Sequence, residues 1–472
     1  MRGDFSIDRF DRSKHFNRVL KQQGRVDLEA DWNEQASIAA HHMRTMLVDL
    51  VGSAAGPVDN AGFGVVDWAN LTDPQKKELA ALKLAPEMGN FLFRPGRYYV
   101  NGLLVENEKF VSFTEQPDWQ AERLKAGIYL VYLDVFEHQV TYLEDDSIRE
   151  IALGGPDTCT RVKTTWQVKV LALSSNAVRV KKAAAAEDKP KQATTKKAKQ
   201  PHAAREGDGS ECDVAMQPLR QWQSGKLRPR LDPGESTDDP CVLAPESRYR
   251  GLENQLYRIE IHRGSDNPEN KPATFKWSRE NGSVATRWVG EQGKSVRVKS
   301  SRGFAAGDWI ELSDAAVATP VADTLYQILS VDGDLLQLNA APPSSSELTT
   351  PLVRRWDQQA NEEIELDQGT ISVEAAKAGD GFVEIESGIE VQFEAGPYRT
   401  GDYWLIPARV VSGDIVWPRE GKDWKQLPPH GVKHHYAPLA RVEITGTENY
   451  VTVLDDCRCL FMPLACMMEQ DP

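Results

Sequence analysis

The stretch Lys14–Gln35, KHFNRVLKQQGRVDLEADWNEQ, marks the start of the principal helix of this chain. The side-chain oxygen of Asp27 can accept hydrogen bonds from the free N–H groups of a first helical turn. From Trp32 onward, apolar or small residues recur at intervals of four and three. Gly52 and Gly56 followed by proline end the pattern. The residues of this stripe, which we call the seam, are Trp32, Ala36, Ala39, Met43, Met46 and Leu50. The spacing predicts an amphipathic helix with one narrow apolar face.

Two interpretations of the seam are open at this point. In the first, the seam packs on the β domain of its own chain. In the second, it meets copies of itself in a homo-oligomer, as the core positions of a coiled coil do. The pattern covers fewer heptads than a coiled coil needs to be recognised from sequence alone. The sequence therefore leaves both interpretations in place.

Beyond the helix, the period changes from helical to strand-like. A short helix is expected within 71–84, and Asn101-Gly102 joins two β-rich runs as a hairpin turn. The nearly continuous apolar run 127–137 predicts a central strand, and short strands within 294–341 predict a small barrel. We therefore expect a mainly β (α+β) fold: antiparallel β modules with an N-terminal amphipathic helix and an inserted small β-barrel.

Composition shifts suggest where the modules begin and end. The Lys/Ala-rich run 181–215 has almost no large apolar residues and is expected to be a disordered linker. The predicted segments are 1–55 (arm and helix), 56–180 (first β domain), 181–215 (linker), 216–293 (β elements of the main domain), 294–345 (barrel), 346–456 (second β block) and 457–472 (docked C-terminal tail).

Charge and hydropathy exclude several functional classes. The net charge of −14 argues against a general nucleic-acid binder, which needs clustered Lys and Arg. No apolar run is long enough to span a membrane, and the charged N-terminus lacks the apolar core of a signal peptide. The sequence therefore predicts synthesis in the cytoplasm without a signal peptide. The six cysteines are few and irregularly spaced, which favours reduced thiols over a disulfide framework.

Two groups of residues are candidate chemical sites. Cys457, Cys459 and Cys466, with His434-His435 upstream, offer zinc-type ligands, but their spacing is not that of a common zinc finger. We expect structural thiols there. Glu384 with Glu386 or Glu390 could form the carboxylate pair of a glycosidase, yet their alternation is that of any solvated strand face. The sequence shows no nucleophile, phosphate-binding or metalloprotease motif. It predicts no enzyme, no catalytic residue, no metal and no cofactor.

The blocks MRGDFS and HFNRVLKQQGRVDLEADWNEQ resemble the N-terminal signature of an uncharacterised family encoded with phage tails and phage-tail-like contractile injection systems. More distantly, they resemble the start of baseplate-wedge and fibre-attachment proteins. Further blocks look like the same family in the same order, among them FRPGRYYVNGLLVENE, GDYWLIPAR and PPHGVKHHYAPLARV. Family members often continue beyond the block that here reads DCRCLFMPLA, so a connector or accessory role fits this chain better than receptor binding.

The resemblance implies a structural component of a phage-tail-like contractile injection particle, acting by protein–protein assembly. Expected partners are the chain itself, as a homo-oligomer with three copies, and baseplate or tail proteins, with no nucleic acid and no membrane insertion. The expected interface residues are Phe5, Phe16, Arg18, Leu20, Arg25, Trp32, Met43, Met46 and Leu50. The alternative is a carbohydrate-binding or carbohydrate-processing tail protein whose exposed aromatics stack on sugar rings. The candidate aromatics are Trp288, Trp309, Trp404 and Trp417.

Overall fold

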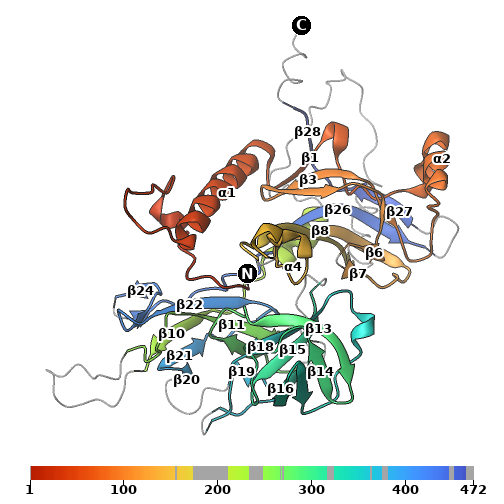
Figure 1. Cartoon of the computed structure of the whole chain (residues 1–472). Coiled ribbons are helices and arrows are strands. Elements are labelled where there is room, and N and C mark those ends of the chain that lie inside the picture. The colour runs from red at the N-terminus through yellow and green to blue at the C-terminus, as the bar shows by residue number, and fades with distance from the viewer. Residues whose placement is uncertain are drawn as a thin grey trace. The chain divides into compact units, whose positions relative to one another are not determined.

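A computed structural model gives the fold of the chain (Figure 1). It describes residues 2–117, 119–154, 157–173, 211–232, 248–265, 267, 271–315, 324–361, 364–374, 381–421, 423–445 and 451–463. The expected mainly β fold class is confirmed. The chain divides into two compact units, each built from segments that are distant in sequence. Unit 1 comprises Met1–Ile38, His138–Lys163 and Gln223–Lys433, and unit 2 comprises Ala39–Glu137, Thr164–Trp222 and His434–Pro472.

The principal helix is α1, Glu29–Val51, and the expected N-terminal helix is thus confirmed. The predicted cap is wrong in detail. Asp27 forms an ion pair with Lys21, 2.8 Å from Nζ to Oδ1, and the helix begins two residues after it. Gly52 ends the helix with φ of +88°, and its N–H donates to the carbonyl of Val48, 2.9 Å away. A glycine adopts this left-handed conformation at little cost, which is why it stops the helix here.

Unit 2 contains two principal sheets. The first has strand order β28-β1-β3-β4 and the second β27-β26-β8-β9. The run expected as a central strand is β8, which is confirmed, since β26 and β9 flank it. The strand bounds are β1 Ala54–Pro57, β3 Gly96–Val100, β4 Leu103–Asn107, β8 Gly127–Val140, β9 Arg161–Ala172, β26 His435–Ile444, β27 Val451–Asp456 and β28 Leu460–Phe461.

Shorter elements complete unit 2. The helix expected within 71–84 is α2, Asp73–Ala81. A second helix, α4, Glu211–Arg220, was not predicted, and residues 211–215 of the expected linker belong to it. The rest of that linker, 181–210, lies outside the described residues. The two-stranded ladders are β2 Leu92–Phe93 with β5 Val111–Ser112, and β6 Glu115–Gln116 with β7 Trp119–Gln120.

Unit 1 contains two open sheets, of order β19-β12-β11-β22-β23 and β10-β21-β20, and a small hairpin ladder. Their bounds are β10 Leu227–Leu231, β11 Gln255–Arg263, β12 Thr274–Ser278, β19 Ile371–Ser372, β20 Val383–Glu386, β21 Ile389–Phe393, β22 Tyr403–Arg409, β23 Asp414–Ile415, β24 Arg419–Glu420 and β25 Asp423–Trp424. Strands β20 and β21 alternate between buried apolar and partly exposed polar residues, as expected for a sheet with one wet face.

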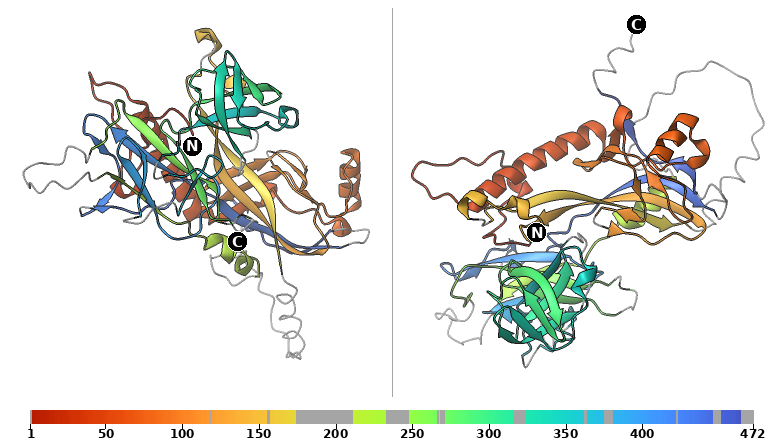
Figure 2. Two further views of the ribbon diagram at one scale, coloured as in Figure 1. Left: turned by 90° about the horizontal axis from the view of Figure 1, so that it is seen from below. Right: turned by 45° about the vertical axis from the view of Figure 1, so that its right-hand side comes forward.

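The expected small barrel is present in unit 1 as a closed barrel of order β13-β14-β17-β16-β15-β18 (Figures 1 and 2, green to cyan). Its bounds are β13 Ala285–Gln292, β14 Ser295–Val298, β15 Trp309–Asp314, β16 Leu325–Asp332, β17 Leu335–Leu338 and β18 Pro351–Trp356. It extends beyond the expected 294–345 at both ends, because β13 pairs with β18 to close the ring. Closure leaves no free sheet edge.

Each module buries its own apolar cluster. The barrel core is formed by residues such as Val296, Ile310 and Leu336. The unit 2 sheets enclose a core around Phe93, Val131 and Leu439.

The 3-10 helices are η1 Arg12–Lys14, η2 Val58–Asn60, η3 Trp68–Asn70, η4 Asp146–Ile148, η5 Ile151–Leu153 and η6 Ser345–Glu347. Within the described part of the chain, every helix is too short or too polar to cross a membrane.

Candidate assembly interface

The seam of α1 is exposed along its whole length. Trp32, Met43, Met46 and Leu50 have exposed fractions of 71%, 59%, 56% and 62%, and the two small seam residues between them are also exposed. The interpretation in which the seam packs on the chain's own β domain is therefore wrong for this structure. An apolar stripe that faces water is a feature of surfaces that bind other proteins. Self-association through the seam stays a prediction.

Other side chains of α1 hold the helix in place. Ala30 and Ile38 are buried, whereas the seam is not. In unit 2, both guanidinium ends of Arg44 donate to the carboxylate of Glu137, at 2.6 and 3.3 Å. The turn between β3 and β4 lies against the same part of the helix, because a Cβ added to Gly102 would lie 2.5 Å from the carbonyl oxygen of Arg44. These contacts fix α1 with its seam exposed.

A short N-terminal segment, Arg2–Ser6, is anchored in unit 1, and we call it the arm. The guanidinium of Arg2 makes a two-point ion pair with Glu260, with Nε 3.1 Å from Oε2. The carbonyl of Gly3 accepts from Nδ2 of Asn281 at 2.9 Å, and the carbonyl of Ser6 accepts from Arg409 at 2.7 Å. The arm thus binds strands β11 and β22 and the turn after β12. We call Glu260, Asn281 and Arg409 the arm site.

The arm site includes a buried group of charges. Glu260 also pairs with Arg258, with Nε–Oε2 of 2.5 Å, and with Lys276, with Nζ–Oε1 of 3.6 Å. Lys276 in turn donates to Glu311 at 2.8 Å. Burial opposes ionisation of Glu260, but the charges of Arg2, Arg258 and Lys276 outweigh it and hold the pKa of this carboxyl well below its usual range. The three cations thus favour the charged form of Glu260.

The arm and the helix are joined by a largely exposed segment, 7–28. Arg9 pairs with Asp31 at 2.5 Å, and the N–H of Val19 donates to Gln35 at 2.8 Å. Of the expected interface residues in the arm and this segment, Phe5 is partly buried. The others are exposed, namely Phe16, Arg18, Leu20 and Arg25. The expected interface residues on α1 all belong to the seam. Those in the segment 7–28 precede the helix in sequence.

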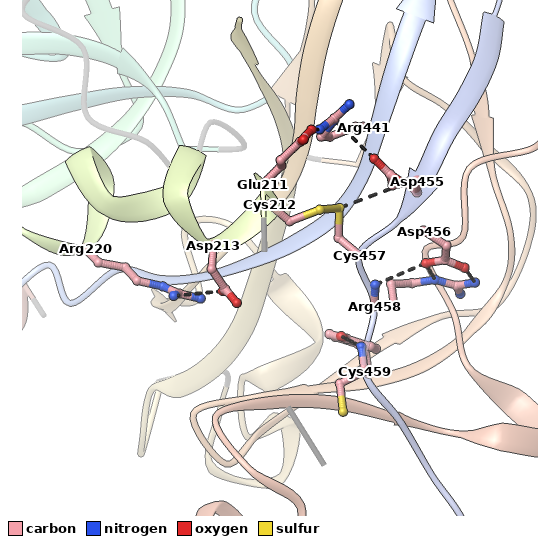
Figure 3. Close-up of a disulfide and its surroundings, with 11 residues drawn as sticks. Glu211, Cys212, Asp213, Arg220, Arg441, Asp455, Asp456, Cys457, Arg458 and Cys459 are labelled. Carbon is pink, nitrogen blue, oxygen red and sulfur yellow. Dashed lines mark hydrogen bonds and ion pairs between the residues drawn. A yellow bond between two sulfur atoms is a disulfide. The ribbon is translucent and has the colours of Figure 1, made fainter. Parts of the chain in front are cut away.

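The cysteines differ from expectation. Cys212 of α4 and Cys457 after β27 form a disulfide across 245 positions of sequence, so the expectation of reduced thiols is wrong for this pair (Figure 3). Beside it, Arg441 forms ion pairs with Glu211 and Asp455, the latter 3.3 Å from Nε to Oδ2. Cys459 is a free, half-buried thiol and Cys159 is free and exposed. Spacing along the chain cannot reveal a bond between residues that only the fold brings together.

The candidate zinc ligands named from the sequence do not form a metal site in the part of the chain that the structure describes. Cys457 is oxidised, Cys466 lies outside the described residues with the rest of 464–472, and His434 pairs with Asp134 at 2.7 Å. His435 contacts the amide of Asn101 at 2.9 Å. Across the described ranges, no group of three or more His, Cys, Asp or Glu residues has the arrangement of a metal site. The described part of the expected docked tail, β28, pairs in parallel with β1.

The candidate glycosidase carboxylates serve as ion-pair partners. Glu386 pairs with Arg279 at 2.8 Å, Glu384 lies 3.6 Å from Arg250, and Glu390 pairs with Arg230. The tryptophans suggested as sugar-stacking platforms are buried, with exposed fractions of 9% or less: Trp288, Trp309, Trp404 and Trp417. The expectation that these rings are exposed is wrong, and the carbohydrate-binding alternative loses the feature on which it rested.

Sequence reasoning missed Arg2 and the arm site. The apolar pattern of β11 is interrupted by Arg258 and Glu260, which are buried at 3% and 1% exposure. Charged residues inside a strand that is otherwise apolar are rarely buried without partners. The two charged residues in this apolar strand indicate that a buried ion pair exists, but they do not identify Arg2 as a member of it.

A family model described as a family of unknown function (DUF6519) matches residues 1–212 and 210–471 of this chain. No curated protein and no solved structure matches it.

Proposed function

We propose that this chain, which belongs to the DUF6519 family of unknown function, is a structural component of a phage-tail-like contractile injection particle. In this proposal it acts by protein–protein assembly, as a baseplate-attached connector, fibre-base or accessory protein. Its partners are further copies of itself and baseplate or tail proteins. The particle is suggested by the resemblance of the N-terminal signature and the ordered blocks that follow it. The assembly role is supported by the exposed seam of α1.

The exposed seam is the observation that carries the assembly role. Burying one fully exposed large apolar side chain contributes about 1.5–3 kcal/mol. The four large seam residues are 56–71% exposed, so their complete burial in an interface would contribute roughly 4–7 kcal/mol. Part of this offsets the lost translational and rotational freedom of the partners. That cost is about 4–15 kcal/mol, of the same order as the gain, so a stable assembly needs a further contact beside the seam.

The charge distribution favours a second copy as a partner of the seam. The whole chain carries a net charge of −14, so two copies repel each other over most of their surfaces. The seam itself contains no charged residue. The one cation of α1, Arg44, is engaged with Glu137. Two seams can therefore meet through uncharged side chains, with the acidic residues of α1, among them Asp31 and Asp49, at the margins of the contact.

The proposal is tested in cells that produce the particle. We expect the wild-type chain to co-sediment with purified particles, and a chain with Trp32→Asp and Met43→Asp to be made but absent from them. Thr45→Asp, which adds the same charge at an exposed position off the seam, serves as the matched control and should be incorporated. Incorporation of the double variant at the wild-type level would overturn the seam as the docking surface. Absence of the wild-type chain from the particles would overturn the particle assignment.

A further inference from the structure

We propose that the arm site is a transferable peptide-binding site, which takes the Arg2–Ser6 arm of a second copy of this chain. The inference rests on the proposed self-association only for bringing the copies together. In this structure the arm lies in the site of its own chain. The same contacts can be made by an identical arm from a neighbour, so that copies exchange arms and become linked.

The arm is recognised as a short peptide would be. One side chain, Arg2, pairs with the buried carboxylate of Glu260, and its guanidinium lies 5.6 Å from the ring centre of Trp356. Two backbone carbonyls, of Gly3 and Ser6, accept hydrogen bonds from the side chains of Asn281 and Arg409. Gly3 is buried, and a Cβ there would come within 2.9 Å of Gln139 and Phe5. The site thus recognises three features of the arm: the positive charge of Arg2, the absence of a side chain at Gly3, and the positions of two backbone carbonyls.

The residues of the arm site are far from the arm in sequence. The Arg2–Glu260 pair spans 258 positions, the bond from Asn281 to Gly3 spans 278, and the bond from Arg409 to Ser6 spans 403. None of these contacts depends on the local covalent path of the arm. An arm supplied by another copy would find the same donors, the same carboxylate and the same aromatic ring.

The segment 7–28 is long enough for the exchange. Its 22 residues could span up to about 70 Å when extended, whereas packed helices lie only about 8–10 Å apart axis to axis. Most of its residues are exposed. Its arm end is tied to the start of α1, because the N–H of Ser6 donates to Glu29 at 2.9 Å and Arg9 pairs with Asp31 at 2.5 Å. Exchange would release these exposed bonds, and Glu29 and Asp31 of the receiving copy offer the same partners to the incoming arm.

Exchange has a simple energetic basis. Each bond that an arm gives up in its own chain forms again in the neighbour, so the arm contributes no net difference between the closed and the exchanged form. The cost is the reduced freedom of two associated copies, which burial of the seam offsets. Once copies are paired, the high effective concentration of the second arm favours its binding. Arm exchange would thus strengthen an assembly that the seam begins.

The first test asks whether the site accepts an arm that is not joined to its own chain. The receiver is the full chain with Arg2→Ala, and the probe is a fluorescent peptide of residues 1–10, MRGDFSIDRF. We expect saturable binding, at least about tenfold weaker for the same peptide with Arg2→Ala, because a charge-assisted bond to a buried carboxylate is lost. A peptide with Asp4→Asn is the matched control and should bind like the original, since Asp4 is exposed. No saturable binding, or equal binding of the Arg2→Ala peptide, would refute the inference.

The second test concerns copies. An affinity-tagged Arg2→Ala chain is mixed with untagged wild-type chain, and captured untagged chain is measured. We expect stronger capture of wild type than of untagged Arg2→Ala. Equal capture of both would mean that the copies associate without exchanging arms, and the seam proposal would stand alone. Peptide binding without any capture would mean that the arm site is real while self-association has failed.

Discussion

Arg2 and Glu260 lie 258 positions apart in sequence and form a two-point ion pair inside unit 1. Glu260 is 1% exposed, so its negative charge depends on the cations around it. The second residue of the chain thus completes the charge group of a core strand. The folded structure of unit 1 therefore includes the arm as well as the β strands.

Replacing Arg2 by alanine should destabilise unit 1. Breaking a buried ion pair costs about 3–5 kcal/mol when the remaining charge has no other partner. Glu260 keeps Arg258 and Lys276, so we expect a smaller loss of about 1–3 kcal/mol in the free energy of unfolding. Urea denaturation measures it, with Asp4→Ala at an exposed arm position as the control. Identical midpoints for the two variants would contradict the role of Arg2.

The seam should control self-association of the purified chain. We expect Met43→Asp to shift the solution mass from oligomer to monomer, because a carboxylate in an apolar interface must be desolvated. Thr45→Asp should leave the mass unchanged. Sedimentation or light scattering over a range of protein concentrations measures both. A wild-type chain that stays monomeric at all concentrations, with and without residues 1–55, would contradict self-association through the seam. The seam would then have to bind a different protein.

The contact between α1 and the β3–β4 turn is tested at Gly102. This residue has φ of +75°, and an added Cβ would lie 2.5 Å from backbone of α1. Gly102→Ala should therefore cost about 1 kcal/mol for the backbone strain and more for displacement of the helix. Gly154→Ala is a matched control, since φ there is +88° with no atom within 4 Å of the added Cβ. The melting temperature should fall clearly further for Gly102→Ala than for Gly154→Ala.

The disulfide should stabilise unit 2. Closing a loop of 245 positions restricts the unfolded chain, and a bond of this kind contributes about 2–5 kcal/mol. Cys212→Ser and Cys457→Ser should each lower the free energy of unfolding by that order, while Cys159→Ser, at an exposed free thiol, should not. Peptide mapping under non-reducing conditions should recover the Cys212–Cys457 link. Its absence from oxidised protein would contradict the structure.

His430 gives a pH dependence of known sign. Burial, with the charge of Lys433 as a second cause, lowers the pKa of His430 to about 4 from 6.5. The neutral ring accepts a hydrogen bond from the N–H of Leu405 at Nδ1, 3.1 Å away. Because the unfolded state binds the proton first, the stabilisation is complete above pH 6.5 and is lost as the pH falls towards 4.

This loss can be isolated by substitution. Between about pH 7 and 4.5 we expect a decrease of about 2–3 kcal/mol in the unfolding free energy from this histidine. His430→Asn, whose amide oxygen can still accept from Leu405, should show a correspondingly shallower pH dependence in urea titrations. Parallel curves for wild type and variant over this range would show that another group is responsible.

Much of the fold could be predicted from local pattern. The apolar period of four and three, ended by Gly52, identified α1, and Asn101-Gly102 identified the β3–β4 turn because both residues adopt positive φ there. The apolar run of β8 indicated a central strand. Helix α4 was missed, because Pro218 and the adjoining Lys/Ala-rich run obscured its pattern.

The sequence by itself determined the fold class, the principal helix and the apolar stripe on it, since these follow from spacing between near neighbours. Only the tertiary structure decided whether the stripe is covered, because exposure depends on which distant residues pack against a face. The same holds for the partners of Arg2 and Cys212, which lie 258 and 245 positions away. Local periodicity carries no information about such distances, and these long-range contacts set the surface that the chain offers to other copies.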